Sequence, residues 1–145
     1  MYGAMRLRFV YLLVLLGCLE GCFGMTRAQL KKTMTVAKKQ CVPKIGVSED
    51  KINKIEEGVF IEDPKVMCFI ACVYKSLQVI KNDRLDRDLI TRQVDILYPN
   101  DMKAPVKKAI DKCFHVPKQH KDICEAAFWT TKCLYDADPA TFIFP

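Results

Sequence analysis

The sequence predicts an all-α fold of about six helices held together by disulfide bonds. Apolar residues recur at helical spacing in one segment after another, and no segment alternates convincingly at the two-residue period of strands. Six cysteines stand in the pattern C-x26-C-x3-C-x40-C-x10-C-x8-C, and a short chain rarely keeps so many unless they are paired. Because pairing needs an oxidising compartment, the same cysteines indicate a secreted, extracellular protein.

Residues 1–24 have the features of a secretory signal peptide. Arg6 and Arg8 precede an apolar run over residues 9–19, and the small Gly24 offers a cleavage position. The run is too short to cross a bilayer, and nothing later in the chain resembles a transmembrane span. We therefore expect export and cleavage.

Cleavage after Gly24 would leave residues 25–145 as one domain. Cys18 and Cys22 would be lost, so the mature chain keeps an even six cysteines, which supports the cut. A bacterial lipoprotein box ending at an acylated Cys18 is the alternative, but Leu16 is a poor fit where a small residue is usual.

The mature chain is moderately basic. Without Arg6, Arg8 and Glu20, the 23 Lys and Arg residues fall to 21 and the 17 Asp and Glu residues to 16, a net charge of +5. The lysines occur as scattered pairs and not as one block with interleaved aromatic residues, which is typical of solvated helix faces. We expect no nucleic-acid partner.

The first two helices are predicted from their caps. Thr26 followed by Gln29 makes a capping box, after which four residues continue at helical spacing. These are Leu30, Met34, Ala37 and Cys41. Ser48 is the N-cap expected for a short second helix that carries Ile52 and Ile55 and ends at Gly58.

The third helix is predicted to be the central one. Asp63 followed by Pro64 is a strong start signal, and the pattern continues to about Ile80. The segment is apolar nearly all round, and a helix of that kind belongs in the middle of a fold.

Three further helices complete the pattern. A turn at Pro99-Asn100 separates a helix bearing Leu89, Ile90, Val94 and Leu97 from one bearing Val106, Ala109, Ile110 and Cys113. The last follows Pro117 and carries Ile123, Cys124, Ala127, Phe128, Thr131 and Cys133. Phe128 and Trp129 are adjacent, so one of these two rings must face outward.

The helices restrict how the cysteines can pair. Cys68 and Cys72 lie at i and i+4 on one helix face, a geometry that favours bonding to two different neighbours over bonding to each other. Excluding that pair leaves 12 of the 15 possible connectivities for six cysteines. Zinc is the competing use of such residues, but the chain has no second close cysteine pair and only His115 and His120 as extra ligands. We expect neither a metal nor another cofactor.

The cysteine spacing resembles that of the six-cysteine insect odorant-binding proteins, the pheromone-binding and general-odorant-binding family. The resemblance covers the whole mature chain and is carried chiefly by the three residues between the second and third cysteines and the eight between the fifth and sixth. The stretches 41–44 (CVPK) and 98–102 (YPNDM) and the apolar end 141–145 (TFIFP) support it.

The resemblance implies the interlocked bridges Cys41–Cys72, Cys68–Cys124 and Cys113–Cys133. It also implies an apolar cavity covered by the C-terminal tail, in a monomer or weak homodimer. The implied function is a carrier that binds small hydrophobic odorants or pheromones and takes them through sensillum lymph to membrane olfactory receptors.

For the ligand-binding pocket we expect apolar residues of the central helix, the fourth and sixth helices and the tail. They are Ile70, Tyr74, Leu77, Leu85, Leu97, Ala127, Leu134, Phe142 and Phe144. Ala127 would leave space and Tyr74 would supply the one phenol that orients a polar ligand head. Phe142 and Phe144 at a free C-terminus would be a solubility liability unless they pack inward as a wall.

The family resemblance also implies ligand release in acid. The two histidines lie away from the expected pocket among basic residues, so carboxylates near the tail are the candidates: Asp136, Asp138 and the Pro145 carboxylate. Ordinary solvated acids are the alternative.

Two other function classes stay open at this point. One is a secreted interaction or signalling protein with a filled core, and the other is a small hydrolase. No Gly-x-Ser-x-Gly element, phosphate loop or paired-carboxylate signature accompanies the histidines, so we expect no enzyme.

Overall fold

The computed structural model describes residues 24–145, and the expected signal peptide therefore falls almost entirely outside the described residues. The elements are α2 (Arg27–Ile45), the 3-10 turns η2 (Glu49–Lys51) and η3 (Ile55–Glu57), α3 (Pro64–Ser76), strands β1 (Ile80–Lys81) and β2 (Arg84–Leu85), α4 (Arg87–Leu97), α5 (Asn100–Cys113), the 3-10 turn η4 (Val116–Gln119) and α6 (Ile123–Ala137). The predicted all-α class is confirmed. None of the helices within residues 24–145 is both long and apolar enough to span a membrane.

Helix α2 begins and buries its face as predicted. The Thr26 hydroxyl accepts a hydrogen bond from the Gln29 backbone N–H at 3.2 Å, and the Thr26 N–H donates to the Gln29 side chain at 2.8 Å, which completes the capping box. Leu30, Met34, Ala37 and Cys41 are all buried. The helix ends at Gly46, whose φ of 67° is left-handed.

The prediction of a second helix was wrong, because this segment forms 3-10 turns. Residues 49–57 form two 3-10 turns, and the Ser48 side chain bonds to Asp50 and not to the backbone. Ile52 and Ile55 are nevertheless buried, and their spacing of three residues matches the three-residue period of a 3-10 turn. Gly58, with φ of 86°, closes the segment against the Tyr135 ring, where a side chain would collide.

Helix α3 starts as predicted and ends four residues early. The Asp63 side chain accepts a hydrogen bond from the Lys65 N–H at 2.8 Å. After Ser76 the chain turns at Gln78, which has φ of 58°, and enters an antiparallel hairpin of β1 and β2. Each strand has two residues, too few to produce an alternating pattern in the sequence.

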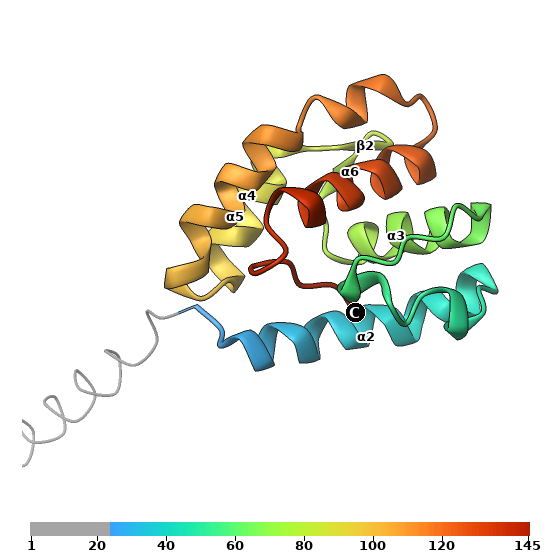
Figure 1. Cartoon of the computed structure of the whole chain (residues 1–145), viewed down its shortest axis with the longest axis horizontal. Coiled ribbons are helices and arrows are strands. Elements are labelled where there is room, and N and C mark those ends of the chain that lie inside the picture. The colour runs from blue at the N-terminus through green and yellow to red at the C-terminus, as the bar shows by residue number, and fades with distance from the viewer. Residues whose placement is uncertain (1–23) are drawn as a thin grey trace, which may run out of the picture.

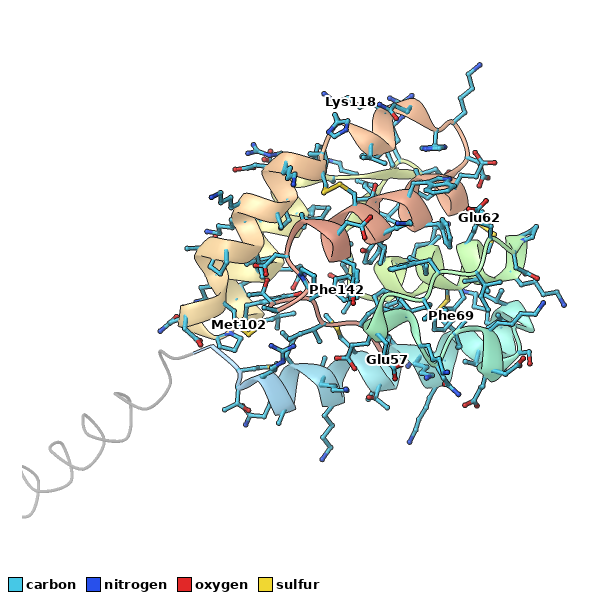
Figure 2. The ribbon with its side chains drawn as sticks, in the orientation of Figure 1. Glu57, Glu62, Phe69, Met102, Lys118 and Phe142 are labelled. Carbon is cyan, nitrogen blue, oxygen red and sulfur yellow. A yellow bond between two sulfur atoms is a disulfide. The ribbon has the colours of Figure 1, made fainter. Side chains whose placement is uncertain are left out.

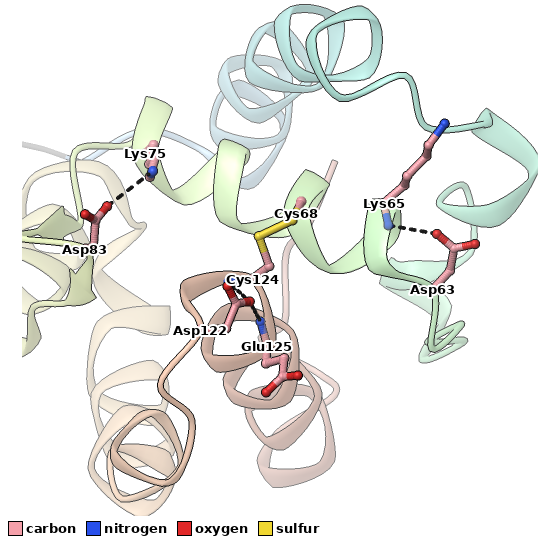
Figure 3. Close-up of a disulfide and its surroundings, with 8 residues drawn as sticks. All are labelled: Asp63, Lys65, Cys68, Lys75, Asp83, Asp122, Cys124 and Glu125. Atoms are coloured by element: carbon pink, nitrogen blue, oxygen red, sulfur yellow. Dashed lines mark hydrogen bonds and ion pairs between the residues drawn. A yellow bond between two sulfur atoms is a disulfide. The ribbon is translucent and has the colours of Figure 1, made fainter.

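The last three α-helices follow the predicted pattern. Helices α4 and α5 flank the turn at Pro99, and α6 is capped by Asp122, whose side chain accepts hydrogen bonds from the Cys124 and Glu125 N–H groups at 2.9 and 3.0 Å (Figure 3). Phe128 faces the core with no exposed surface, and Trp129 is the ring that faces outward.

Three disulfides connect these helices, in the same pairs that the resemblance implies. Cys41–Cys72 joins α2 to α3, Cys68–Cys124 joins α3 to α6 (Figure 3), and Cys113–Cys133 joins α5 to α6. Cys68 and Cys72 bond to different neighbours, as their placement on one helix face predicts. Helix α3 is thereby attached to both α2 and α6.

The main core lies where α3 packs between α2 and α6. Its largest fully buried rings are Phe69 and Phe128. Helices α4 and α5 lie side by side at the other end of the molecule (Figure 1). The C-terminal tail runs back from the end of α6 into the space between α6 and α2 (Figure 1). A second, smaller cluster forms beside the tail, from Leu30, Met34, Met102 and Ile143.

Candidate ligand-binding cavity

An apolar cavity of about 110 Å³ lies between α2, α3, the hairpin, α4, α5, α6 and the C-terminal tail. Its walls are predominantly aliphatic and aromatic side chains from segments far apart in the sequence. The lining residues are Met34, Val73, Tyr74, Leu77, Val79, Leu85, Ile90, Gln93, Val94, Leu97, Tyr98, Val106, Ala109, Ile110, Phe114, Thr130, Leu134, Asp138, Thr141, Phe142, Ile143 and Phe144.

Seven of the nine predicted pocket residues line this cavity. They are Tyr74, Leu77, Leu85, Leu97, Leu134, Phe142 and Phe144. Ile70 and Ala127 do not. Both are fully buried in the main core, because the cavity reaches only the C-terminal half of α3 and lies beyond Ala127 on α6. Ala127 therefore provides room for core packing and not for the cavity.

The prediction missed much of the wall contributed by α4 and α5. Ile90 and Val94 on α4 and Val106, Ala109 and Ile110 on α5 all line the cavity. Their helical spacing was visible in the sequence as apolar faces. Periodicity alone could not show that these faces border a cavity and not a filled core.

The C-terminal tail forms one wall of the cavity, as expected. The side chains of Phe142, Ile143 and Phe144 are only 8%, 5% and 2% exposed. Phe142 lies in the centre of the molecule in Figure 2. Phe144 packs edge-on against Phe69 and Tyr74, with ring centroids 6.3 Å apart in each pair. The tail is thus part of the core as well as a wall of the cavity.

An arginine at the start of α2 holds the tail in place. The Arg27 guanidinium donates hydrogen bonds to the carbonyl oxygens of Ala140 at 2.8 Å and Phe142 at 3.2 Å. The sequence offered no signal for this contact, because the partners are backbone atoms more than a hundred residues away.

The acidic residues expected near the tail have different surroundings. Asp136 pairs with Lys132 at 2.8 Å on the exposed side of α6. Asp138 lines the cavity and accepts a hydrogen bond from the Thr141 hydroxyl at 2.7 Å, within the turn that leads into the tail. Within residues 24–145 no ion pair involves the Pro145 carboxylate.

Two phenols line the cavity, those of Tyr74 and Tyr98. The Tyr74 hydroxyl lies 2.6 Å from the Thr131 hydroxyl, which itself donates to the Ala127 carbonyl at 2.7 Å. Since a hydroxyl has one proton, Tyr74 is the donor in the first bond. Burial raises the pKa of the Tyr74 phenol above its ordinary value and raises the pKa of Tyr98 to about 12, so both phenols are neutral at physiological pH.

The histidines lie outside the cavity. His120 stacks on Trp129 with centroids 6.2 Å apart and contacts Glu125, beside an open surface groove, and His115 bonds to the Lys112 carbonyl. No group of three metal-ligating side chains comes together anywhere in the part of the chain that the structure describes.

Comparison with known proteins finds one family over most of the described chain. The model of the PBP/GOBP family matches residues 24–137. General odorant-binding protein 72 of Anopheles gambiae is 28% identical over 122 residues, which are 84% of this chain and all of that protein. General odorant-binding protein 19a of Drosophila melanogaster is 26% identical over 84% of this chain and 85% of its own length.

Solved structures agree with the sequence comparisons. Odorant binding protein 4 of Chrysopa pallens superposes with a TM-score of 0.75 at 34% identity, covering 83% of this chain and 99% of its own. Apis mellifera odorant binding protein 5 gives 0.74 at 26% identity over 84% and 99%. Odorant Binding Protein 7 from Anopheles gambiae, solved with an azo compound, gives 0.58 at 25% identity over 75% and 85%.

Proposed function

The chain belongs to the PBP/GOBP family, and on this basis we propose that it is a secreted carrier of small hydrophobic odorants or pheromones. It takes up the ligand in the cavity between α3 and the tail, and it delivers the ligand through an aqueous lymph to membrane olfactory receptors. The single observation that carries the proposal is the apolar cavity, because the transfer of a small hydrophobic molecule from water into such a site lowers the free energy.

The cavity volume limits the size of the ligand. About 110 Å³ is on the scale of an engineered apolar protein cavity of roughly 150 Å³ that admits benzene. A ligand of one aromatic ring or a short aliphatic chain therefore suits the site. The azo compound in the Anopheles gambiae structure supports small-molecule binding by this family.

The cavity also favours a carrier over the two alternatives. A signalling protein with a filled core has no use for an apolar cavity among its helices. A hydrolase would need an activated nucleophile or a general base in the site. The lining holds no histidine, serine or cysteine, and its one carboxylate, Asp138, accepts a hydrogen bond from Thr141 in the turn before the tail.

Displacement of a fluorescent apolar probe tests the proposal. We expect residues 25–145 to bind the probe, small hydrophobic odorants to displace it, and p-nitrophenyl esters to remain uncleaved. Ala109 lines the cavity and Ala104 is exposed on the same helix, so Ala109→Leu should weaken probe binding while the matched Ala104→Leu should not. Absence of probe binding would favour a signalling protein, and ester turnover would favour a hydrolase.

Secretion is a separate part of the proposal. Expression of the full chain in insect cells should place the protein in the medium, with Met25 as its first residue by N-terminal sequencing. Retention of residues 1–24 on the purified protein would contradict the signal peptide.

A further inference from the structure

The first residues of the described chain pack against the end of α4 (Figure 1). The Met25 backbone N–H donates a hydrogen bond to the Leu97 carbonyl oxygen at 3.1 Å. Leu97 is the last residue of α4, and the final carbonyl groups of a helix have no partner within the helix itself. The chain then turns at Pro99, which has no N–H to offer. A donor from the start of the chain therefore satisfies a carbonyl that α4 leaves unpaired.

This contact leaves no room for a side chain at residue 24. A Cβ atom built on Gly24 would lie 2.2 Å from the Tyr98 carbonyl oxygen, far inside van der Waals contact. Residue 24 thus lies directly against a second carbonyl at the same end of α4. A residue larger than glycine would push the start of the chain away from both oxygens.

The start of the chain also lies behind the wall of the ligand cavity. The Met25 side chain packs against the smaller cluster, together with Leu97, Tyr98 and Val106. The latter three residues also line the cavity. The Met25 sulfur accepts a hydrogen bond from the Thr33 hydroxyl at 3.7 Å, which connects it to α2. Met25 therefore joins α2 to the part of the wall that α4 and α5 contribute.

Cleavage of the expected signal peptide would change the chemistry of this contact. Hydrolysis of the Gly24–Met25 peptide bond leaves a carboxylate on Gly24 and an α-amino group on Met25. Such groups titrate near about pH 8 and are mainly protonated at neutral pH. The new ammonium has additional N–H donors and a positive charge at the negative end of the α4 dipole. Because charge-assisted hydrogen bonds are stronger than neutral ones, cleavage should strengthen the contact.

We propose that the amino terminus created by cleavage is a positioning group for the cavity wall. The Met25 ammonium binds the Leu97 and Tyr98 carbonyl oxygens and holds the end of α4 against α2. A ligand then dissociates more slowly from the cleaved protein than from a chain whose amino terminus is extended or blocked. The inference rests on the proposed cleavage after Gly24. It goes beyond the carrier function, because an apolar cavity needs no free amino group to take up a ligand.

Four proteins that differ only at the amino terminus test the inference. Two are residues 25–145, with a free or an acetylated amino group, and two are residues 24–145, unsubstituted or with Gly24→Ala. Acetylation keeps an N–H and removes the charge, whereas Gly24→Ala adds one methyl group where the Tyr98 carbonyl lies. Lys32→Gln in the free chain is the matched control, because Lys32 is exposed on α2 and its loss also removes one positive charge.

Two rates are measured for each protein. One is the dissociation of the fluorescent apolar probe, and the other is hydrogen exchange at the Tyr98 amide, which bonds to the Val94 carbonyl at 3.1 Å in the last turn of α4. We expect acetylation to raise both rates two- to fivefold, on the order of 0.4 to 1 kcal/mol, and Lys32→Gln to leave both unchanged. Gly24→Ala should raise both rates at least twofold over the unsubstituted chain of residues 24–145.

Equal rates for the free and acetylated proteins, or for the two chains that begin at residue 24, would overturn the inference and leave the carrier function intact. A secreted protein that begins at a residue other than Met25 would overturn it in the same way, because the ammonium would then lie elsewhere. If residues 25–145 bind no probe, the carrier function fails instead, and the hydrogen-exchange comparison still decides the amino-terminal contact.

Discussion

The double role of the tail can be separated by two alanine substitutions, Phe144→Ala and Phe60→Ala. Each ring packs against three other aromatic rings: Phe144 against Phe69, Tyr74 and Phe142, and Phe60 against Phe128, Tyr135 and Phe142. Only Phe144 lines the cavity. Both substitutions should lower stability, but only Phe144→Ala should change ligand binding.

The expected magnitudes follow from burial. Phe144 is 2% exposed, and truncating a buried phenylalanine to alanine costs about 3–5 kcal/mol of unfolding free energy. Phe60 is half-buried, so its loss should cost less. If a ligand covers one face of the Phe144 ring, roughly 50 Å² of apolar contact is lost, which at about 25 cal/mol per Å² is close to 1.2 kcal/mol, or about eightfold in affinity.

The assay combines urea unfolding followed by circular dichroism with titration of a fluorescent apolar probe. Probe affinities are compared at a temperature where both variants are more than nine-tenths folded, so that lost stability does not pass for lost affinity. We expect Phe60→Ala to keep the wild-type affinity within twofold. Equal probe affinity in Phe144→Ala and the wild type would refute the role of this ring as a cavity wall and leave it as core alone.

Three further predictions concern the tail, the bridges and alkaline pH. Arg27→Ala should speed hydrogen exchange at Phe142 and accelerate ligand release, because two hydrogen bonds to the tail are lost, and unchanged rates would contradict the restraint. Replacing Cys113 and Cys133 by alanine should lower the unfolding free energy by about 3 kcal/mol, since the bridge closes a loop with a sequence separation of 20, and urea denaturation measures this. The pKa of Tyr98 is raised to about 12 from an ordinary value of 10.0, so the stability that its neutral phenol contributes is complete below pH 10 and is lost as the pH rises through 12. Tyr98→Phe should therefore make the unfolding free energy fall less steeply between pH 10 and 12. An unchanged slope of unfolding free energy against pH would contradict this prediction.

Local signals in the sequence determined most of the helices and their ends. The capping box at Thr26, the Asp63-Pro64 start and the turn at Pro99 each depend on atoms within a few residues, and the structure has all three. The separation of Cys68 from Cys72 follows from their place on one helix face. These features were predictable because short-range geometry decides them.

Where the local signals were weak or ambiguous, the tertiary structure decided which element formed. The end of α3 at Ser76, the hairpin after it and the 3-10 turns at residues 49–57 depend on which side chains the rest of the fold buries. A two-residue strand leaves no period to detect, and two isoleucines three residues apart fit a 3-10 turn as well as one turn of α-helix.

The same limit applies to the cavity. Hydrophobic periodicity reports that a side chain leaves water, but it does not report whether the space beyond is another side chain or a void. In the sequence, Ile70 and Tyr74 both read as buried residues of one helix, and so do Ala127 and Leu134. Only the packing of the helices places Ile70 and Ala127 in the core and Tyr74 and Leu134 in the cavity wall. Thr130 and Thr131 are adjacent and chemically identical, yet Thr130 is among the residues that line the cavity while the Thr131 hydroxyl pairs with Tyr74 in the core, because the packing of α6 against α3 places the two side chains differently.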